Sequence, residues 1–247
     1  MNVWSYGGGT QTAAIAVLIL QGKLPRPDLV VFADTARELS TTWDYLAEIV
    51  QPALDSIGLT VQVAGHELSN YDLTSSGRNL LPLFTTQGGS VGKLPTYCSN
   101  EWKQRPIRRW LRQQGADDCD VWLGISTDEI ERMKPSGLKW YRHVYPLIEI
   151  VPTNRAGCVA LVENYGWPTP PKSRCWMCPN QSADAWRQMR RDLPDEYQKA
   201  VTLDAEIRLV DPHVYLHSSG KPLPEGVELS DNQPGLFDGC DGGYCFV

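Results

Sequence analysis

The sequence predicts an α/β fold with a doubly wound, mostly parallel sheet, and three observations lead to it. Residues 2–5 read as a short strand, a glycine-rich turn follows at 5–12, and an apolar run over 13–20 continues as a helix. A continuous apolar run over 28–33 suits a strand that is buried on both faces. Strands and helices then alternate with short links, which is the βαβαβ pattern of such sheets.

Elements farther along the chain follow from the same criteria. Apolar residues recur at helical spacing over 40–57, where Pro52 is a candidate kink. Residues 66–96 are rich in Gly, Ser and Asn without a sustained period, so we expect a long loop that borders the substrate site. The other expected elements are strands over 59–64 and 120–126 and helices over 153–165 and 195–210.

The length of 247 residues allows one large domain with a smaller appendage. We expect a core over 1–150 and a helical region over 151–217 that carries a Cys-x-x-Cys motif. The final stretch, 218–247, is rich in Gly, Pro and Asp and is expected to be a tail.

Charge and hydropathy narrow the class of protein. The net charge of −6 argues against a general polyanion binder. No apolar run approaches the ~20 residues of a membrane helix, and no basic-then-apolar leader opens the chain, so we expect a cytoplasmic protein that does not enter a membrane. One basic stretch could still meet phosphates, and it contains Lys103, Arg105, Arg108, Arg109 and Arg112.

The glycine-rich turn predicts a phosphate cradle. Its glycines let the backbone approach a ligand, and the first N–H groups of the following helix favour an anion. Ser5, Thr10 and Thr12 add hydroxyl donors. The turn has neither the Gly-Lys-Ser/Thr of a Walker A motif nor the Gly-x-Gly-x-x-Gly spacing of dinucleotide-binding folds. A tight turn without any ligand is the alternative.

Polar residues follow two other predicted strands. Asp34 comes directly after the strand over 28–33, either to face a ligand or to cap the next helix. Asp128 follows the strand over 120–126, and it would face a ligand or fill the acidic first turn of a helix. Gly124 would let a ligand approach this edge, and Arg132 is a candidate partner for a phosphate or sulfate.

In the cytoplasmic protein that we expect, the closely spaced members of the seven cysteines indicate metal binding or thiol chemistry. Cys175 and Cys178 place two sulfurs within reach of one metal, cluster or disulfide, and a redox pair, a zinc site and an iron–sulfur site all stay open. Cys98 precedes a helix whose positive end would stabilise a thiolate, whereas Cys158 is expected to be a core thiol.

Four motifs in order resemble the PP-loop adenine nucleotide α-hydrolase superfamily. The turn Ser5-Tyr-Gly-Gly-Gly-Thr-Gln-Thr12 is similar to the Ser-Phe-Gly-Gly-Gly-x-Gln-Ser variant of the PAPS-reductase-like branch, with Gln11 where many PP-loop enzymes carry Asp. The other three motifs are Phe32-Ala-Asp-Thr35, the Cys98–Pro106 segment and Leu123-Gly-Ile-Ser-x-Asp-Glu129. The resemblance implies a five-stranded parallel sheet with helices on both faces.

The resemblance also implies an enzyme that adenylates a substrate with ATP and Mg²⁺ and then transfers sulfur to it. Asp34 would face the adenosine or the metal, and Lys103 and Arg132 would meet anionic groups. A 4Fe–4S cluster on Cys98, Cys175 and Cys178 would match PP-loop sulfur-transfer enzymes. The residues expected to hold the nucleotide are Ser5, Gly7, Gly8, Gly9, Thr10, Gln11, Thr12, Asp34, Gly124 and Asp128.

The expected partners are ATP, an RNA or DNA substrate contacted by Arg105, Arg108 and Arg109, a sulfur-donor protein and, in a homodimer, a second copy of the chain. One alternative activity is sulfonucleotide reduction, with Cys240 or Cys245 attacking sulfur, although the Glu-Cys-Gly-hydrophobic-His motif of those reductases is absent. These two cysteines could otherwise carry a thiol, complete the cluster or have no role. A nucleotide-binding redox sensor without catalysis is the other alternative.

Overall fold

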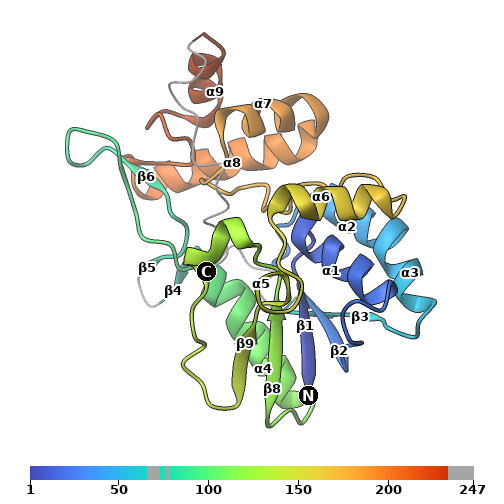
Figure 1. Ribbon diagram of the computed structural model, residues 1–247. Helices are drawn as coiled ribbons and strands as arrows, with labels where there is room; N and C mark the ends of the chain where they lie inside the picture. Colours follow the sequence, from blue (N-terminus) through green and yellow to red (C-terminus); the bar gives the residue numbers. More distant parts are fainter. Residues whose placement is uncertain (66–72, 76–77, 233–247) are drawn as a thin grey trace. The chain divides into compact units, whose positions relative to one another are not determined.

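The computed structural model describes residues 1–65, 73–75 and 78–232 (Figure 1). The chain divides into two compact units. Unit 1 comprises Met1–Ser69 and Trp102–Arg174, and unit 2 comprises Asn70–Glu101 and Cys175–Val247. Each unit therefore combines two separate stretches of the sequence.

Unit 1 is built on a five-stranded sheet in which every pair of neighbours is parallel, which confirms the predicted fold class. The strand order is β3-β2-β1-β8-β9. The chain runs outward from β1 to β3 on one side and then returns to the other side of β1. The order thus reverses between β1 and β8, which is where open α/β sheets bind ligands. The strands are β1 (Asn2–Tyr6), β2 (Leu29–Ala33), β3 (Val61–Ala64), β8 (Cys119–Leu123) and β9 (Tyr141–Val144).

Helices cover both faces of this sheet, as expected for a doubly wound fold (Figure 1). Successive residues of β1 point to opposite faces. Trp4 belongs to the same core cluster as helix α1 (Thr10–Leu20), whereas Val3 belongs to the cluster that includes Leu111 of α4 (Arg105–Gln113). Helix α6 (Arg155–Asn164) lies against α1. These two layers bury the central strands β1 and β2 on both faces.

The predicted helix over 40–57 is interrupted. It consists of α2 (Ser40–Tyr45), a π-helical turn (Leu46–Val50) and α3 (Gln51–Asp55). Pro52 has no N–H to donate to the carbonyl four residues earlier, so the hydrogen-bond register widens just before it. The expected kink therefore takes the form of a π-helical turn.

Two further parts of unit 1 differ from expectation. Strand β9 was missed, because its sequence, Tyr-Arg-His-Val, is neither a continuous apolar run nor a clean alternation. The predicted strand over 120–126 ends at Leu123, and Thr127–Arg132 forms a 3₁₀ turn. Short helix α5 (Pro146–Glu149) then leads toward α6.

Unit 2 is mainly helical. Buried Asp204 of α8 organises it, since its carboxylate accepts hydrogen bonds from the backbone N–H groups of Leu216 and Leu223 at 2.9 and 3.0 Å. The expected loop over 66–96 contains short antiparallel strands where the structure describes it. The elements are β4 (Thr74–Ser75), β5 (Arg78–Asn79), β6 (Phe84–Thr85), β7 (Gly92–Lys93), α7 (Ala183–Asp192), α8 (Pro194–Val210), β10 (Val214–Tyr215) and α9 (Leu223–Asn232).

A π-helical turn, Asn100–Gln104, connects the two units just before α4. In the described ranges, no helix is long and apolar enough to cross a membrane.

Candidate functional site at the carboxyl end of the sheet

The glycine-rich turn lies at the carboxyl end of β1, the central strand. Ser5 is still part of that strand and pairs with Val31 of β2 and Leu123 of β8. Gly7, Gly8 and Gly9 make the turn, and α1 begins at Thr10. The sequence therefore places the start of an eleven-residue helix at the point where the strand order reverses.

Gly8 is required by the geometry of this turn. Its φ is +75°, and an added Cβ would lie 2.4 Å from the side-chain methyl of Thr42. Gly7 is not required in the same way, because an added Cβ there would lie 3.7 Å from the methyl of Thr12, which is an ordinary van der Waals distance. Gly8 thus fixes the shape of the turn through both its backbone conformation and its lack of a side chain.

The hydroxyl of Thr12 holds the turn closed. It donates to the carbonyl oxygen of Gly9 at 2.8 Å and accepts the Gly9 N–H at 3.1 Å. Thr10 is buried at the start of the helix. The hydroxyl of Thr12, expected to contact phosphate, is therefore engaged within the turn itself.

A buried chain of polar side chains lies against the turn. Ser173 packs on it, with its Cβ 3.6 Å from the position that a Cβ of Gly9 would take. The hydroxyl of Ser173 donates to Glu38 at 3.4 Å, and the other carboxylate oxygen of Glu38 binds Lys103 Nζ at 2.7 Å. The side chain of Glu38 is fully buried. Lys103 is thus held beside the glycine turn by a carboxylate.

Asp34 shapes the end of β2. Its Oδ1 accepts the backbone N–H of Ala36 at 2.6 Å, and Ala36 has a φ of +56°. The N-cap of α2 is Leu39, so the alternative in which Asp34 caps the next helix is wrong. Asp34 is 8% exposed and lies at the same carboxyl edge as the glycine turn.

Gln11 connects the glycine turn to the segment after β8. Its side-chain amide donates to Ser126 Oγ at 3.4 Å and to Glu129 Oε2 at 3.1 Å. Glu129 Oε1 in turn binds Arg132 Nη1 at 2.5 Å. The unusual amide of Gln11 thus has a carboxylate as its partner, 118 residues away in the chain.

Gly124 and Asp128 have structural partners at this edge. A Cβ on Gly124 would lie 2.8 Å from the methyl of Thr12, so the glycine lets β8 approach α1. Asp128 Oδ1 accepts the N–H of Arg155 at the start of α6. Partial burial alone would raise the pKa of Asp128, but hydrogen bonds from Ser126 and from backbone N–H groups bring it below its usual range.

The cysteines predicted to bind a cluster all belong to unit 2. Cys175 and Cys178 share a turn in which the Cys178 N–H donates to the Cys175 carbonyl at 3.1 Å. The backbone N–H of Cys98 donates to Leu80 at 2.9 Å, and all three side chains are half-buried. In the part of the chain that the structure describes, no group of three or more His, Cys, Asp or Glu side chains is arranged to hold a metal ion.

The other cysteines differ from these three. Cys158 is fully buried, as expected for a core thiol, and burial raises its pKa to about 12. Cys119 is also fully buried, and burial raises its pKa as well. Cys240 and Cys245 lie outside the described residues.

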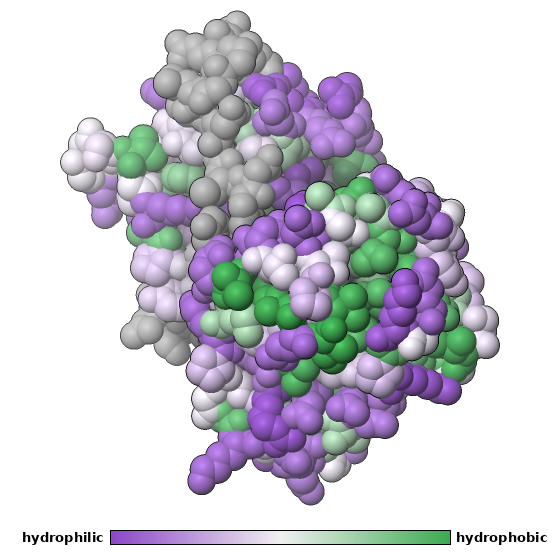
Figure 2. Space-filling model, in the orientation of Figure 1, coloured by the Kyte–Doolittle hydropathy of each residue, from purple (hydrophilic) through white to green (hydrophobic). Residues whose placement is uncertain are grey.

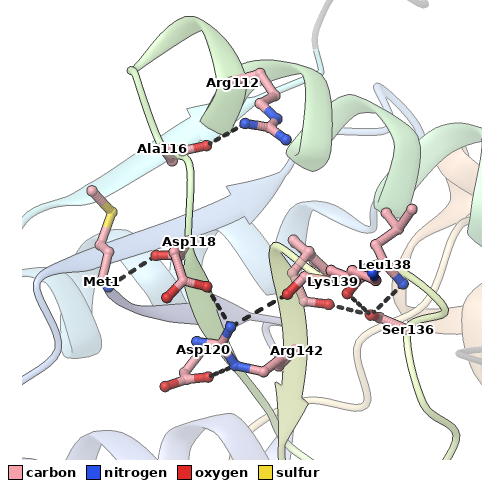
Figure 3. Close-up of polar contacts among 10 residues, drawn as sticks. Met1, Arg112, Ala116, Asp118, Asp120, Ser136, Leu138, Lys139 and Arg142 are labelled. Carbon is pink, nitrogen blue, oxygen red and sulfur yellow. Dashed lines mark hydrogen bonds and ion pairs between the residues drawn. The ribbon is translucent and has the colours of Figure 1, made fainter.

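The amino end of the same sheet carries a different kind of charge cluster (Figure 3). Arg142 of β9 pairs with Asp118 and with Asp120, the latter at 2.7 Å. Arg112 of α4 pairs with Asp117 at 2.8 Å and stacks on Trp140. Figure 2 shows mostly hydrophilic residues at the end of unit 1 where β8 and β9 begin. One of the arginines in the predicted phosphate-binding stretch is therefore engaged in an ion pair.

Comparisons with known proteins identify no family for the chain. No protein-family model matches it, and no curated protein matches it. A solved structure of phosphoadenylyl-sulfate (PAPS) reductase from Candida auris, in complex with phosphate, is 14% identical with a TM-score of 0.44, over 69% of this chain and 75% of that one. The U34-tRNA thiolase NcsA from Methanococcus maripaludis, with its 4Fe–4S cluster, is 12% identical with a TM-score of 0.42, over 94% of this chain and 72% of that one. At these TM-scores we base function on the residues of this chain alone.

Proposed function

We propose that this chain is an ATP-dependent enzyme of the PP-loop type that adenylates a substrate oxygen and then transfers sulfur to the activated carbon. One observation carries the proposal. The glycine turn and the start of α1 lie at the reversal of strand order between β1 and β8. In open α/β sheets, ligands bind at this point, and phosphates bind at helix N-termini.

The residues of this edge fit a polyphosphate. The first N–H groups of α1 have no partners within the helix, and the helix dipole favours an anion beside them. Gly8 adds no side chain to this backbone, and none would fit there because the methyl of Thr42 lies 2.4 Å from the position that its Cβ would take. Mg²⁺, when bound, would offset the charge of the pyrophosphate.

Two cations next to the turn support the same proposal. Lys103 is held by Glu38, and Arg132 is held by Glu129. Fixed charges of this kind need no reorganisation when negative charge develops on a phosphate, and such preorganisation is a major source of catalysis. We assign both cations to the stabilisation of the departing pyrophosphate.

The proposed reaction has two steps. The substrate oxygen attacks the α-phosphorus of ATP, and the bond to the β-phosphate oxygen breaks to release pyrophosphate. Hydrosulfide from a sulfide donor then attacks the carbon that bears the adenylated oxygen. The bond from this carbon to that oxygen breaks, AMP leaves with the oxygen, and the S–H proton passes to solvent. The first step turns a poor leaving group into a good one, which is the purpose of the ATP.

The predicted 4Fe–4S ligands do not form a metal site among the described residues, so neither step is assigned to a cluster. Cys98, Cys175 and Cys178 remain candidates because all three belong to unit 2 and are half-buried. Iron and zinc analysis of protein purified without oxygen tests this directly. Iron that is lost in both Cys98→Ala and Cys175→Ala would support the cluster, and zinc or no metal would contradict it.

The activity is tested by the products of ATP. We expect AMP and pyrophosphate when the protein is incubated with ATP, a sulfide donor and a panel of RNA, DNA and nucleotide substrates. Lys103→Met should slow their formation, whereas Arg142→Gln, at the amino end of the sheet, should not. ADP and orthophosphate, or no turnover across the panel, would contradict the proposal. Sulfite from PAPS or adenylyl sulfate would indicate the sulfonucleotide reductase instead.

A further inference from the structure

The contact between Gln11 and Glu129 links two elements that both border the proposed polyphosphate site. Gln11 is the second residue of α1, and Glu129 lies in the 3₁₀ turn after β8. The amide nitrogen of Gln11 is 3.1 Å from one oxygen of Glu129, and Arg132 Nη1 is 2.5 Å from the other. One carboxylate therefore holds both the first turn of the helix and a guanidinium.

These side chains are largely shielded from water. The side chain of Arg132 is 7% exposed and that of Glu129 is 12% exposed. Arg132 Nε is buried and has no hydrogen-bond partner among the described residues. A buried donor without a partner is costly, and a phosphate oxygen bound to it would remove that cost.

The charges of this group are balanced as they stand. Gln11 is neutral, and the charges of Glu129 and Arg132 cancel. A carboxylate at position 11 would face Glu129 at hydrogen-bond distance with no second cation in the group, and like charges at that distance repel strongly when water is excluded. The amide at position 11 is therefore matched to the carboxylate at position 129.

We propose that Glu129 is a positioning residue that holds the Arg132 guanidinium beside the glycine turn. Glu129 competes with polyphosphate for this guanidinium, and the neutral side chain of Gln11 allows Glu129 to stay ionised next to it. The inference rests on the proposed function, because it assumes a nucleoside triphosphate at the turn. On binding, the phosphate takes hydrogen bonds from Arg132, including that of Nε, while Gln11 keeps Glu129 in place. Glu129 thereby lowers the affinity for ATP and sets the position of the cation.

Isosteric variants test this arrangement by the affinity for ATP, measured by calorimetry on the full chain. Glu129→Gln removes the competing charge, so ATP should bind more tightly, by about threefold to tenfold. Gln11→Glu adds a facing charge, so ATP should bind more weakly, by about tenfold or more. The double variant Q11E/E129Q restores one amide and one carboxylate and should recover most of the loss.

Controls separate this proposal from a purely structural role. Thermal unfolding of each variant reports on folding, and Arg142→Gln should bind ATP as the unaltered chain does. If Glu129 only supported the local structure, Glu129→Gln would weaken the binding of ATP, whereas our proposal requires that ATP bind more tightly. If Gln11→Glu does not fold, Glu129→Gln and the double variant still decide the outcome.

Two results would overturn the proposal. Weaker or unchanged ATP binding in Glu129→Gln would show that Glu129 does not compete for Arg132. A double variant no better than Gln11→Glu alone would show that the two positions are not coupled. The two failures are distinguishable by the unaltered chain. If it does not bind ATP at all, the proposed function fails and this inference fails with it; if it binds ATP but the variants behave as just described, this inference alone fails.

Discussion

The two ends of the same parallel sheet hold their charges in opposite ways. At the amino end, Arg142 is 46% exposed and pairs with Asp118 and Asp120, which are 69% and 39% exposed. At the carboxyl end, the side chain of Glu38 is 0% exposed and that of Arg132 is 7% exposed. Exposed pairs form at little cost and contribute little, whereas buried pairs carry a large desolvation cost. Buried charge thus gathers at the end of the sheet that we assign to function.

The largest effect is expected at Gly8. Gly8→Ala places a Cβ 2.4 Å from Thr42 in a backbone with a φ of +75°, so strain and steric overlap act together. We expect a loss of about 3 kcal/mol in the free energy of unfolding and no measurable binding of ATP. Chemical denaturation and calorimetry measure the two effects.

Gly22 offers a matched control for that change. It has nearly the same φ, +69°, but an added Cβ would meet nothing within 4 Å. Gly22→Ala should therefore lose only the backbone term, about 1–2 kcal/mol, and should bind ATP normally. Equal losses at Gly8 and Gly22 would mean that contact with Thr42 does not shape the turn.

The next effect concerns the buried pair of Glu38 and Lys103. Lys103→Met leaves the carboxylate of Glu38 buried without this cation. Breaking a fully buried pair in this way costs about 3–5 kcal/mol, and because the side chain of Lys103 is 19% exposed we expect a smaller loss, about 2 kcal/mol. The double variant Glu38→Gln with Lys103→Met removes the stranded charge and should recover part of the stability. Chemical denaturation measures the free energy of unfolding of both variants. A loss below about 1 kcal/mol in Lys103→Met would mean that this pair contributes no more than an exposed ion pair does.

A smaller effect is expected for Asp128, and it depends on pH. The pKa of Asp128 is lowered in the folded protein, so its stabilising contribution is present above its unfolded pKa of 3.8 and is lost as pH falls through its folded value. Asp128→Asn should therefore lower the free energy of unfolding at neutral pH, where the contribution of the carboxylate is fully present, and flatten the further loss below about pH 4, so that the difference from the unaltered chain closes in acid. An unchanged acid limb of the unfolding curve would contradict this.

The smallest effect is expected at the amino end of the sheet. Arg142→Gln should lower the free energy of unfolding by less than about 1 kcal/mol, and added salt should reduce the difference further. Denaturation in low and high salt measures it. If Arg142→Gln lowered the free energy of unfolding as much as Lys103→Met does, the ion pairs at the two ends of the sheet would not differ in their contribution to stability.

Local signals in the sequence predicted much of the fold. The strongest signals were the sequences of β1, β2 and β8 and the glycine turn before α1. Each of these patterns lies within a few neighbouring residues, so it does not depend on the tertiary structure. Strand β9 was missed because Arg142 and His143 interrupt any apolar pattern. The helix α7 was missed as well, since charged residues dominate its sequence.

The contacts of the candidate site could not be read in the same way. Neither Glu38 nor Ser173 belongs to a recognisable sequence motif. They are 135 residues apart in the chain, and only the tertiary structure brings them into hydrogen-bond contact. The partner of the Gln11 amide, Glu129, is 118 residues away in the chain, so no local signal could connect the two. The assignment of Arg132 and Lys103 to anionic groups stays a prediction, and their carboxylate partners depend on the tertiary structure.

The central claim is that the carboxyl end of the sheet in unit 1 binds the polyphosphate of ATP. Hydrogen exchange measured by mass spectrometry, with and without ATP, tests it most directly because it reports on both ends of the sheet at once. We predict slower exchange in peptides that cover residues 7–12 and 124–132, and no change in those that cover 117–120 and 139–142. Unchanged exchange at the glycine turn, or protection at the amino end instead, would contradict the claim.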